Sequence, residues 1–394
     1  MSWFALGTIV SALAVTLAAG LFRNRYFASF VAVILTVQAL CAIGLYPLFE
    51  GIAPVYIGLQ AAVHIHMLAL TQPRMRPLWW RALISVPGFF FTAGTWLALP
   101  WAVITAFGFE PYGAWVPFVV AAVGVVQSLY TREEEIDLVL DGEASTNEVG
   151  RYPRGSGTSP RPLTFVQITD PHLGPLMSVK RLRRICERAV ERAPDVIFLT
   201  GDFLTMESQA DPQVMVDALM PLKAYEGRVF ACLGNHDHEA PALVRNALRR
   251  CGVTLLVDEE AVFEAPTGPL QILGCDFSFR ERKERLADVC ERFPRRDGHL
   301  RVVLLHDPGA FKHLPEGHGD LVLSGHTHGG QVGLLSLGAA WTFVSGFTSI
   351  PDHGFWARGT DRMYVHRGTG VYGFPLRVGV PGEQSLVRLH RSGV

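Results

Sequence analysis

The sequence predicts two unlike parts: a polytopic α-helical membrane domain over residues 1–131 and a layered α/β (α+β) domain over residues 132–394. Three observations predict this division. The first third of the 394-residue chain carries few charges, the remainder alternates strand-like apolar runs with helical segments, and polar groups follow those runs. The net charge of −1 argues against a protein that coats the phosphate backbone of a nucleic acid.

The membrane part is predicted from long apolar stretches, since a spanning helix needs roughly 20 consecutive apolar residues. We expect about five spans, at Trp3 to Phe22, Phe27 to Phe49, Ile52 to Leu70, Ala82 to Phe107 and Tyr112 to Tyr130. The full charges between Met1 and Thr131 are Arg23, Arg25, Glu50, Arg74, Arg76, Arg81 and Glu110. Buried helices of a soluble protein are a weaker alternative, because so many successive segments are nearly free of charge.

A cleaved signal peptide is the alternative for the first stretch. The opening "MSWFALGTIV" lacks the positively charged region with which a signal peptide begins, and further apolar segments follow it. The sequence therefore favours a first span that is retained.

Basic residues in the short loops predict the orientation. The loop after the first span contains "RNR" and the loop after the third contains "QPRMRPLWWR", whereas the loops after the second and fourth carry only Glu50 and Glu110. Basic loops stay on the cytoplasmic side of a membrane. We therefore expect an integral protein of the cell inner membrane, with its amino terminus outside and everything after Tyr130 in the cytoplasm. One span more or fewer would reverse the side of the carboxyl-terminal part.

Cysteine and histidine usage in the chain is only weakly informative. Cys41 lies in a span and the other five cysteines are scattered without C-x-x-C spacing, so we expect reduced and mostly buried thiols. His64 and His66, in "AVHIHML", lie at membrane depth, where ionisable groups are candidates for function. Neutral histidines that hydrogen-bond between helices cost less free energy, and the sequence favours that interpretation.

The second part of the chain repeats one pattern. "LTFVQITD", "VIFLTGD" and "RVFACLGNHDH" are typical of strands, and the helical segments "SVKRLRRICERAVERAPD" and "PQVMVDALMPLKAY" separate them. The short run "IDLVLDG" precedes these elements, and "LQILGCDF", "RVVLLHDP" and "DLVLSGHTH" follow them. This alternation predicts a layered core of sheets and helices. Each polar cluster lies where a strand gives way to a loop, which is where open α/β sheets collect ligands.

The strand ends supply oxygen and imidazole donors and no thiolate. They are Asp170, His172, Asp202, Asn235, His236, His306, His326 and His328. D-x-H, G-D and G-N-H-D are each common as ordinary caps and turns, and only "GHTHGGQ" is more specific. Their joint occurrence in this order, each after an apolar run, favours a binding site. Such donors suit Mn²⁺, Fe²⁺ or Zn²⁺ in a reactive centre better than a structural zinc site.

The order D-x-H, G-D, G-N-H-D, H, G-H-x-H resembles that of the calcineurin-like metallophosphoesterases, roughly from Ile136 to the carboxyl end. The forms "GHTHGGQ" and "YVHRGTGVYGFPLRVGVPGE" are similar to a membrane-associated bacterial branch that includes the UDP-2,3-diacylglucosamine pyrophosphohydrolases. Members of that branch usually read P-P-E-I where this chain reads "PGEQ". The resemblance implies a layered β-sandwich flanked by helices and two divalent metal ions.

The resemblance also implies a role for each residue of the site. One metal ion would be held by Asp170, His172 and His328, the second by Asn235, His306 and His326, and Asp202 would bridge both. Manganese is the expected ion, and iron(II) and zinc are the alternatives. His236 would donate a proton or a hydrogen bond to the leaving-group oxygen, with Asp237 orienting its ring. Gln331 is expected either to bind substrate or to stabilise its loop.

Together these expectations describe a membrane-anchored phosphohydrolase that cleaves a phosphoester or pyrophosphate bond. Placement at a bilayer favours a phosphorylated lipid or nucleotide-linked lipid such as UDP-2,3-diacylglucosamine, and no nucleic acid is expected as a partner. One alternative is a broad-specificity phosphodiesterase or phosphatase that acts on soluble nucleotides and uses its spans only as an anchor. The other is a non-catalytic membrane sensor on the same fold. The sequence indicates no particular protein partner.

Overall fold

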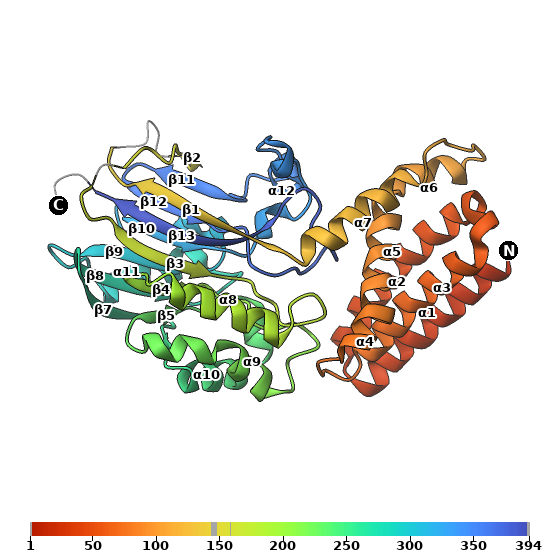
Figure 1. The fold of residues 1–394 in the computed structure, drawn as a ribbon, viewed down its shortest axis with the longest axis horizontal. Coiled ribbons are helices and arrows are strands. Elements are labelled where there is room, and N and C mark those ends of the chain that lie inside the picture. Colours follow the sequence, from red (N-terminus) through yellow and green to blue (C-terminus); the bar gives the residue numbers. More distant parts are fainter. Residues whose placement is uncertain (1, 143–147, 158, 392–394) are drawn as a thin grey trace.

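The computed structural model describes residues 2–142, 148–157 and 159–391. Figure 1 shows a bundle of apolar helices at one end of the molecule and two layered β-sheets at the other. The predicted fold class is confirmed: a mixed α/β domain with sheets flanked by helices follows apolar helices at the amino-terminal end.

The first sheet has six strands in the order β1-β13-β3-β4-β5-β6. Their bounds are Thr131–Val139 for β1, Leu163–Ile168 for β3, Val196–Leu199 for β4, Val229–Ala231 for β5, Thr254–Leu255 for β6 and Gly382–His390 for β13. Strands β3, β4 and β5 run parallel, with Phe165 opposite Val196 and Phe198 opposite Phe230. The carboxyl ends of these three strands therefore meet at one edge of the sheet.

The second sheet has seven strands in the order β2-β11-β12-β10-β9-β8-β7. Their bounds are Gly150–Arg151 for β2, Glu259–Ala265 for β7, Gly268–Cys275 for β8, Leu300–Leu305 for β9, Leu321–Ser324 for β10, Gly354–Arg358 for β11 and Asp361–Val365 for β12. Strands β8, β9, β10 and β12 are parallel to their neighbours in that group, with Val302 opposite Leu321.

The two sheets pack face to face because side chains alternate along each strand. Phe165 and Phe198 of the first sheet share a buried core with Val302 and Leu323 of the second. The outer face of the first sheet is covered by α8 (Val179–Glu191), α9 (Pro212–Leu219) and α10 (Pro241–Arg250). Helix α11 (Arg282–Arg292) covers the outer face of the second sheet. The result is the helix-flanked β-sandwich that the resemblance implies.

The amino-terminal helices are apolar on nearly all sides. Their bounds are Trp3–Phe22 for α1, Arg25–Leu45 for α2, Ala53–Ala69 for α3, Leu78–Trp80 for α4, Val86–Leu97 for α5, Leu99–Ala106 for α6 and Val116–Ser128 for α7. By length and composition, Trp3–Phe22 and the run Arg25–Ala69 are able to cross a bilayer, and so is Leu78–Leu97 with Leu99–Ala106 if this bent pair counts as one span. The count of five spans stays a prediction.

The run Arg25–Ala69 folds back on itself at the 3₁₀ helix Tyr46–Ile52. Gln38 of α2 donates a hydrogen bond to Gln60 of α3 at 3.1 Å, and the Tyr56 hydroxyl donates to the Ala42 carbonyl at 2.9 Å. A straight helix would separate Gln38 from Gln60 by roughly 33 Å at 1.5 Å per residue. Helices α2 and α3 therefore lie side by side and antiparallel.

His64 is hydrogen-bonded between helices, as the sequence favoured. Its Nδ1 lies 2.7 Å from Ser11 Oγ of α1 and its Nε2 lies 3.0 Å from Gln60 Nε2. His66 differs, because its Nδ1 is buried without a hydrogen-bond partner among the described residues. All six cysteines are free and buried, as expected.

Both basic loops of the helical bundle lie against the β-sandwich domain. Arg23, in the loop between α1 and α2, donates a hydrogen bond to Gln209 Oε1 at 2.8 Å. Arg81, at the start of the fourth helical run, donates to the Pro175 carbonyl at 3.4 Å. At the end of α7, Ser128 Oγ accepts a 2.7 Å hydrogen bond from the Arg377 backbone N–H. The loops predicted to be cytoplasmic therefore lie on the same side of the bundle as the sandwich.

Candidate metal centre

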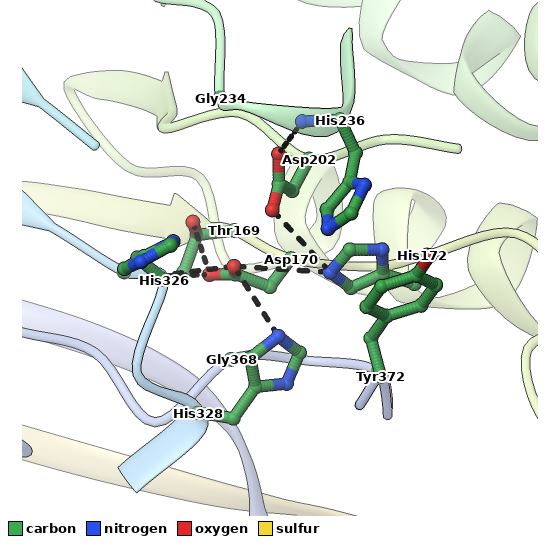
Figure 2. A network of polar contacts seen from close by, with 12 residues as sticks. Thr169, Asp170, His172, Asp202, Gly234, His236, His326, His328, Gly368 and Tyr372 are labelled. Atoms are coloured by element: carbon green, nitrogen blue, oxygen red, sulfur yellow. Dashed lines mark hydrogen bonds and ion pairs between the residues drawn. The ribbon is translucent and has the colours of Figure 1, made fainter. Parts of the chain in front are cut away.

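The polar motifs of the sequence converge at one edge of the sandwich. Asp170 and His172 follow β3, Asp202 follows β4, and Asn235 and His236 follow β5. His306 follows β9, and His326 and His328 follow β10. Because neighbouring parallel strands end at the same edge, residues far apart in the chain meet there. Figure 2 shows the side chains of Asp170, His172, Asp202 and His328 pointing toward one another, with His236 and His326 beside them.

The convergence forms two clusters of potential metal ligands. We call Asp170, His172 and His328 the first cluster, and Asp202, His306 and His326 the second cluster. Within each cluster one donor atom of every residue lies within 4.8 Å of the others. Asn235, which the resemblance assigns to the second ion, directly precedes His236 in the chain, and its Oδ1 is buried.

The Asp202 carboxylate lies between the two clusters. Its Oδ2 is 3.2 Å from His306 Nε2 of the second cluster and 3.6 Å from His172 Nε2 of the first. Asp170 Oδ1 is 3.4 Å from His328 Nε2 and 3.9 Å from His306 Nε2. One oxygen of Asp202 therefore faces imidazoles from both clusters, which is the position a bridging carboxylate requires.

The donor atoms fit a pair of cations. His172 Nδ1 lies 3.2 Å from the Leu204 carbonyl and His306 Nδ1 lies 2.6 Å from the Thr200 carbonyl, so these nitrogens carry the ring protons. The Nε2 atoms of both rings and Asn235 Oδ1 are buried and have no hydrogen-bond partner among the described residues. Buried lone pairs without a partner cost free energy, and cations between them and the carboxylates would satisfy them.

The backbone is strained at the same residues. Asp170, His172, Asp202, His326 and His328 all have positive φ, between 47° and 64°. Residues other than glycine seldom adopt this left-handed region, and such strain concentrates at functional sites. The "GHTH" segment therefore does not continue strand β10, which ends at Ser324, but turns sharply.

Two glycines allow the carboxylates to lie so close to neighbouring backbone. A Cβ on Gly325 would come 2.2 Å from Asp170 Oδ2, and a Cβ on Gly234 would come 2.2 Å from Asp202 Oδ1. Both contacts are much shorter than any carbon–oxygen contact in proteins, so larger residues would displace the ligands. Backbone N–H groups then fix the carboxylates: His326 N donates to Asp170 Oδ1 at 3.0 Å, and His236 N donates to Asp202 Oδ1 at 2.9 Å.

Burial and neighbouring charges control the protonation of the site. Burial raises the pKa of Asp170 to about 6. Burial also opposes ionisation of Asp202, but the nearby His306 outweighs it and holds the pKa of that carboxyl below its ordinary value. Burial would lower the pKa of His306, yet Asp202 and Asp170 raise it to about 10. Asp202 thus remains a carboxylate at neutral pH.

The prediction that Asp237 orients the His236 ring is wrong. The ring does not contact Asp237; instead His236 Nδ1 lies 2.7 Å from Glu239 Oε1. Asp237 is fully buried and its carboxylate accepts three backbone N–H groups, from Asp202, Phe203 and Gly234, at 2.8 to 2.9 Å. Asp237 therefore fixes the loops that carry Asp202 and Asn235. No periodicity or motif in the sequence singles out Glu239.

Tyr372 is a residue of the site that the sequence did not indicate. Its ring stacks on His172 with 4.5 Å between ring centroids, and it lies 4.3 Å from the His236 ring. The contacts of Gln331 favour the loop-stabilising role over the substrate-binding one. Its Nε2 donates to the carbonyls of Tyr372 and Phe374 at 2.7 and 2.9 Å, and its Oε1 accepts from Tyr372 N at 3.1 Å. Gln331 stabilises the loop that carries Tyr372.

Arg377 connects the same loop to the turn that carries His328, a candidate metal ligand. Its guanidinium is buried and donates to the carbonyls of His328 at 3.1 Å, Gly368 at 3.0 Å and Gly370 at 2.6 Å. Its backbone N–H reaches Ser128 at the end of α7. The first cluster is therefore joined through one arginine to the helical bundle.

Comparison with known proteins places this site in a family. Residues 163–330 match the family model of the calcineurin-like phosphoesterases, and this range contains all the predicted site residues. Phosphodiesterase YaeI of Escherichia coli is 28% identical over 234 residues, which cover 58% of this chain and 82% of that protein. The UDP-2,3-diacylglucosamine pyrophosphatase LpxG of Chlamydia trachomatis is 25% identical over 283 residues, which cover 57% of this chain and 83% of LpxG.

A relative with membrane helices is also similar. The transmembrane protein with metallophosphoesterase domain of Danio rerio is 29% identical over 254 residues, which cover 58% of this chain and 54% of that protein. These matches agree with the two ligand clusters and the helix-flanked sandwich. The chain therefore carries a domain of the calcineurin-like metallophosphoesterases, a family of metal-dependent phosphoester hydrolases.

Proposed function

We propose that this protein is a membrane-anchored phosphohydrolase with two divalent metal ions, which cleaves a phosphoester or pyrophosphate bond in a lipid-linked substrate. The observation that carries this proposal is the Asp202 carboxylate, one oxygen of which faces imidazoles from both ligand clusters. We take residues 1–131 as the membrane domain and residues 132–394 as the catalytic domain.

The proposed ligand sets take the two clusters and add Asn235, whose buried Oδ1 lacks a hydrogen-bond partner among the described residues. Asp170, His172 and His328 would hold one ion; Asn235, His306 and His326 would hold the other; and Asp202 would be shared. This all-nitrogen-and-oxygen set favours manganese, with iron(II) or zinc as alternatives. When bound, a metal pair activates water as the nucleophile and neutralises the charge of phosphate oxygens.

His236 is the residue we assign to proton donation. Its Nδ1 is hydrogen-bonded to Glu239, and although burial opposes protonation, Glu239 and Asp202 raise the pKa of His236. The ring therefore keeps its proton to a higher pH than an ordinary histidine, which suits a group that passes a proton to the oxygen of the leaving group. Tyr372 packs against both His236 and His172, so it limits the positions that these rings adopt.

Two observations support a lipid-linked substrate. Apolar helices lie directly against the edge of the sandwich that carries the ligands, which would be unnecessary for a substrate dissolved in the cytoplasm. One relative acts, by its name, on UDP-2,3-diacylglucosamine, and we propose a substrate of this kind. The name of the Escherichia coli relative favours a second candidate, a phosphodiesterase of broader specificity. The complete set of buried donors argues against a non-catalytic sensor.

We further propose that the catalytic domain faces the cytoplasm from an inner membrane. The loops that carry Arg23, Arg25, Arg74, Arg76 and Arg81 are on the side of the bundle next to this domain. Positively charged loops are retained in the cytoplasm, and the domain next to them would be retained with them.

Substitution of the shared carboxylate tests the function most simply. Asp202→Ala should reduce Mn²⁺-dependent hydrolysis of bis(p-nitrophenyl) phosphate by the detergent-purified full chain by roughly 1,000-fold or more, because both metal ions lose a ligand. The matched control is Asp217→Ala, an exposed aspartate on α9, which should leave turnover unchanged. Equal turnover by the Asp202→Ala variant and the wild type would contradict the metal assignment.

Substitution of His236 tests its role as the proton donor. His236→Ala should lower kcat by roughly 100-fold or more for an alkyl phosphoester, and by much less for a p-nitrophenyl ester, whose leaving group needs no proton. Glu239→Gln should show the same dependence on the leaving group with a smaller loss. Metal content, measured by plasma mass spectrometry, should stay at the wild-type value in both variants.

His238→Ala is the control for that test, because the neighbouring His238 ring contacts Asp276 at 2.9 Å and not the clusters. It should retain wild-type kinetics with both esters. Parallel loss of metal and turnover in His236→Ala, without dependence on the leaving group, would show that His236 serves the metal site instead.

A further inference from the structure

A cavity of about 310 Å³ lies between the helical bundle and the catalytic domain. Its walls on the bundle side come from α2, α3 and α5, and its walls on the catalytic side come from residues 172–176, 205–207 and 371–375. Most of these side chains are apolar, among them Ile34, Met67, Leu176 and Phe374. The cavity therefore suits an apolar group and not a second phosphate.

One end of the cavity reaches the metal centre. His172, a member of the first cluster, contributes to the wall, and so does Tyr372, whose ring stacks on it. Figure 2 shows Tyr372 lying beside His172 and His236. A molecule in the cavity is thus within reach of the reacting phosphorus position without leaving the apolar walls.

The opposite end lies among helix faces that are open to the surroundings of the bundle. Phe30, on α2, contributes to the wall and is 40% exposed. Ile34 on α2 and Trp96 on α5 also contribute and are partly exposed. For a bundle embedded in a bilayer these faces contact acyl chains, so lipid has direct access to the cavity.

Two polar groups in the cavity wall lack partners. Glu207 is 1% exposed, and neither of its carboxylate oxygens has a hydrogen-bond partner among the described residues. His66 Nδ1 is likewise buried and unpartnered within the same part of the chain. Burial raises the pKa of Glu207 to about 7, although Arg76 and Arg81 oppose this. An apolar cavity with two buried polar groups that lack hydrogen-bond partners fits an amphipathic ligand whose amide or hydroxyl would form hydrogen bonds with them.

We propose that this cavity binds an acyl chain of the substrate while its phosphate lies at the two ligand clusters. Glu207 and His66 then receive the polar group that links the chain to the head group. This inference rests on the proposed function and deepens it, because the membrane helices become part of the substrate site and not merely an anchor. The substrate class is an acylated phosphoester or pyrophosphate drawn from the bilayer.

Alkyl p-nitrophenyl phosphodiesters with chains of one to eight carbons test the proposal when every ester is monomeric. For the full-length protein with Mn²⁺, kcat/KM should rise with chain length, by at most about fourfold for each methylene that enters the cavity. Ile34→Trp, which fills the cavity, should reduce the octyl-to-methyl ratio of kcat/KM by roughly tenfold.

Val33→Trp is the matched control, because the adjacent Val33 is 62% exposed on α2 and does not contribute to the cavity. It should keep the wild-type dependence on chain length. A wild-type protein that hydrolyses all esters with equal kcat/KM, or equal effects of the two tryptophans, would overturn the cavity while leaving the phosphohydrolase intact.

Binding is tested separately from turnover by a diazirine-labelled phosphatidic acid in nanodiscs that contain the full chain. Photo-crosslinks should appear on Met206 or within residues 371–375, which line the cavity, and Ile34→Trp should reduce them. Crosslinks confined to the outer helix faces would overturn the proposal even if esters are hydrolysed. Crosslinks in the cavity without any ester hydrolysis would support the lipid site and contradict the proposed function.

A second surface is defined by different residues. The segment Leu334 to Ile350 contains no charged residue, and its large side chains are exposed, with Leu337 at 81%, Phe347 at 72% and Phe343 at 54%. It includes the short helix α12 (Phe343–Phe347), which Thr342 caps and joins to Asp352 through a 2.5 Å hydrogen bond. We call these residues the apolar segment.

The apolar segment adjoins the membrane helices. Gln127, near the end of α7, donates a 2.8 Å hydrogen bond to Ser336, and Figure 1 shows α12 on the side of the sandwich next to α7. Exposed aromatic residues next to a spanning helix are typical of groups that lie at the bilayer interface. We infer that the apolar segment inserts into the lipid interface and holds the catalytic domain against the membrane.

Fluorescence of a Cys-attached dye tests this insertion. Because all six native cysteines are buried, Phe347→Cys labelled with nitrobenzoxadiazole should report only on the apolar segment. In nanodiscs its emission should shift to the blue and be quenched by doxyl-labelled lipid. The control is Phe279→Cys, which is 72% exposed and lies outside the segment, and it should show neither effect. Emission and quenching equal to those of the control would overturn the inference.

Discussion

The rest of the site depends on the position of the Asp202 carboxylate, which lies between the two clusters. A buried carboxylate that faces two imidazoles is stabilised by positive charge, which a cation between the rings or a protonated His306 would supply. The fold therefore has to fix that carboxylate closely from several directions. The His236 backbone N–H donates a hydrogen bond to one oxygen of the Asp202 carboxylate. Five of the candidate ligands have left-handed backbone, and Gly234 leaves room for Asp202 where any larger side chain would collide with it.

The same constraint explains the role of residues far from the clusters. Asp237 is fully buried so that its carboxylate holds three backbone N–H groups of the ligand loops, which is a positioning role. Arg377 connects the carbonyl of His328 to the loop of residues 368–370, and its own backbone contacts Ser128 of α7. The geometry of the first cluster is thus coupled physically to the packing of the amino-terminal helices, and the cavity lies along this junction.

The convergence of the polar motifs was predictable from the sequence, because each motif directly follows an apolar run that forms a strand. The strands before "TDPH", "TGDF", "GNHD", "LHDP" and "GHTH" are apolar runs, and parallel strands bring their ends to one edge. The contacts of His236 were not predictable, because Glu239 reaches the ring only through the 3₁₀ turn His236–Glu239. The positions of Tyr372 and Glu207 depend on how the loops of residues 371–375 and 205–207 pack against the bundle, and sequence periodicity does not predict such packing.

The central claim is that two metal ions share one carboxylate, and electron paramagnetic resonance of the Mn²⁺-loaded full-length protein tests it most directly. Two manganese ions roughly 3.5 to 4 Å apart and bridged by Asp202 would be magnetically coupled. The account predicts two ions per chain and the multiline spectrum of a coupled pair. A six-line spectrum of isolated Mn²⁺, with one ion per chain at saturation, would contradict it.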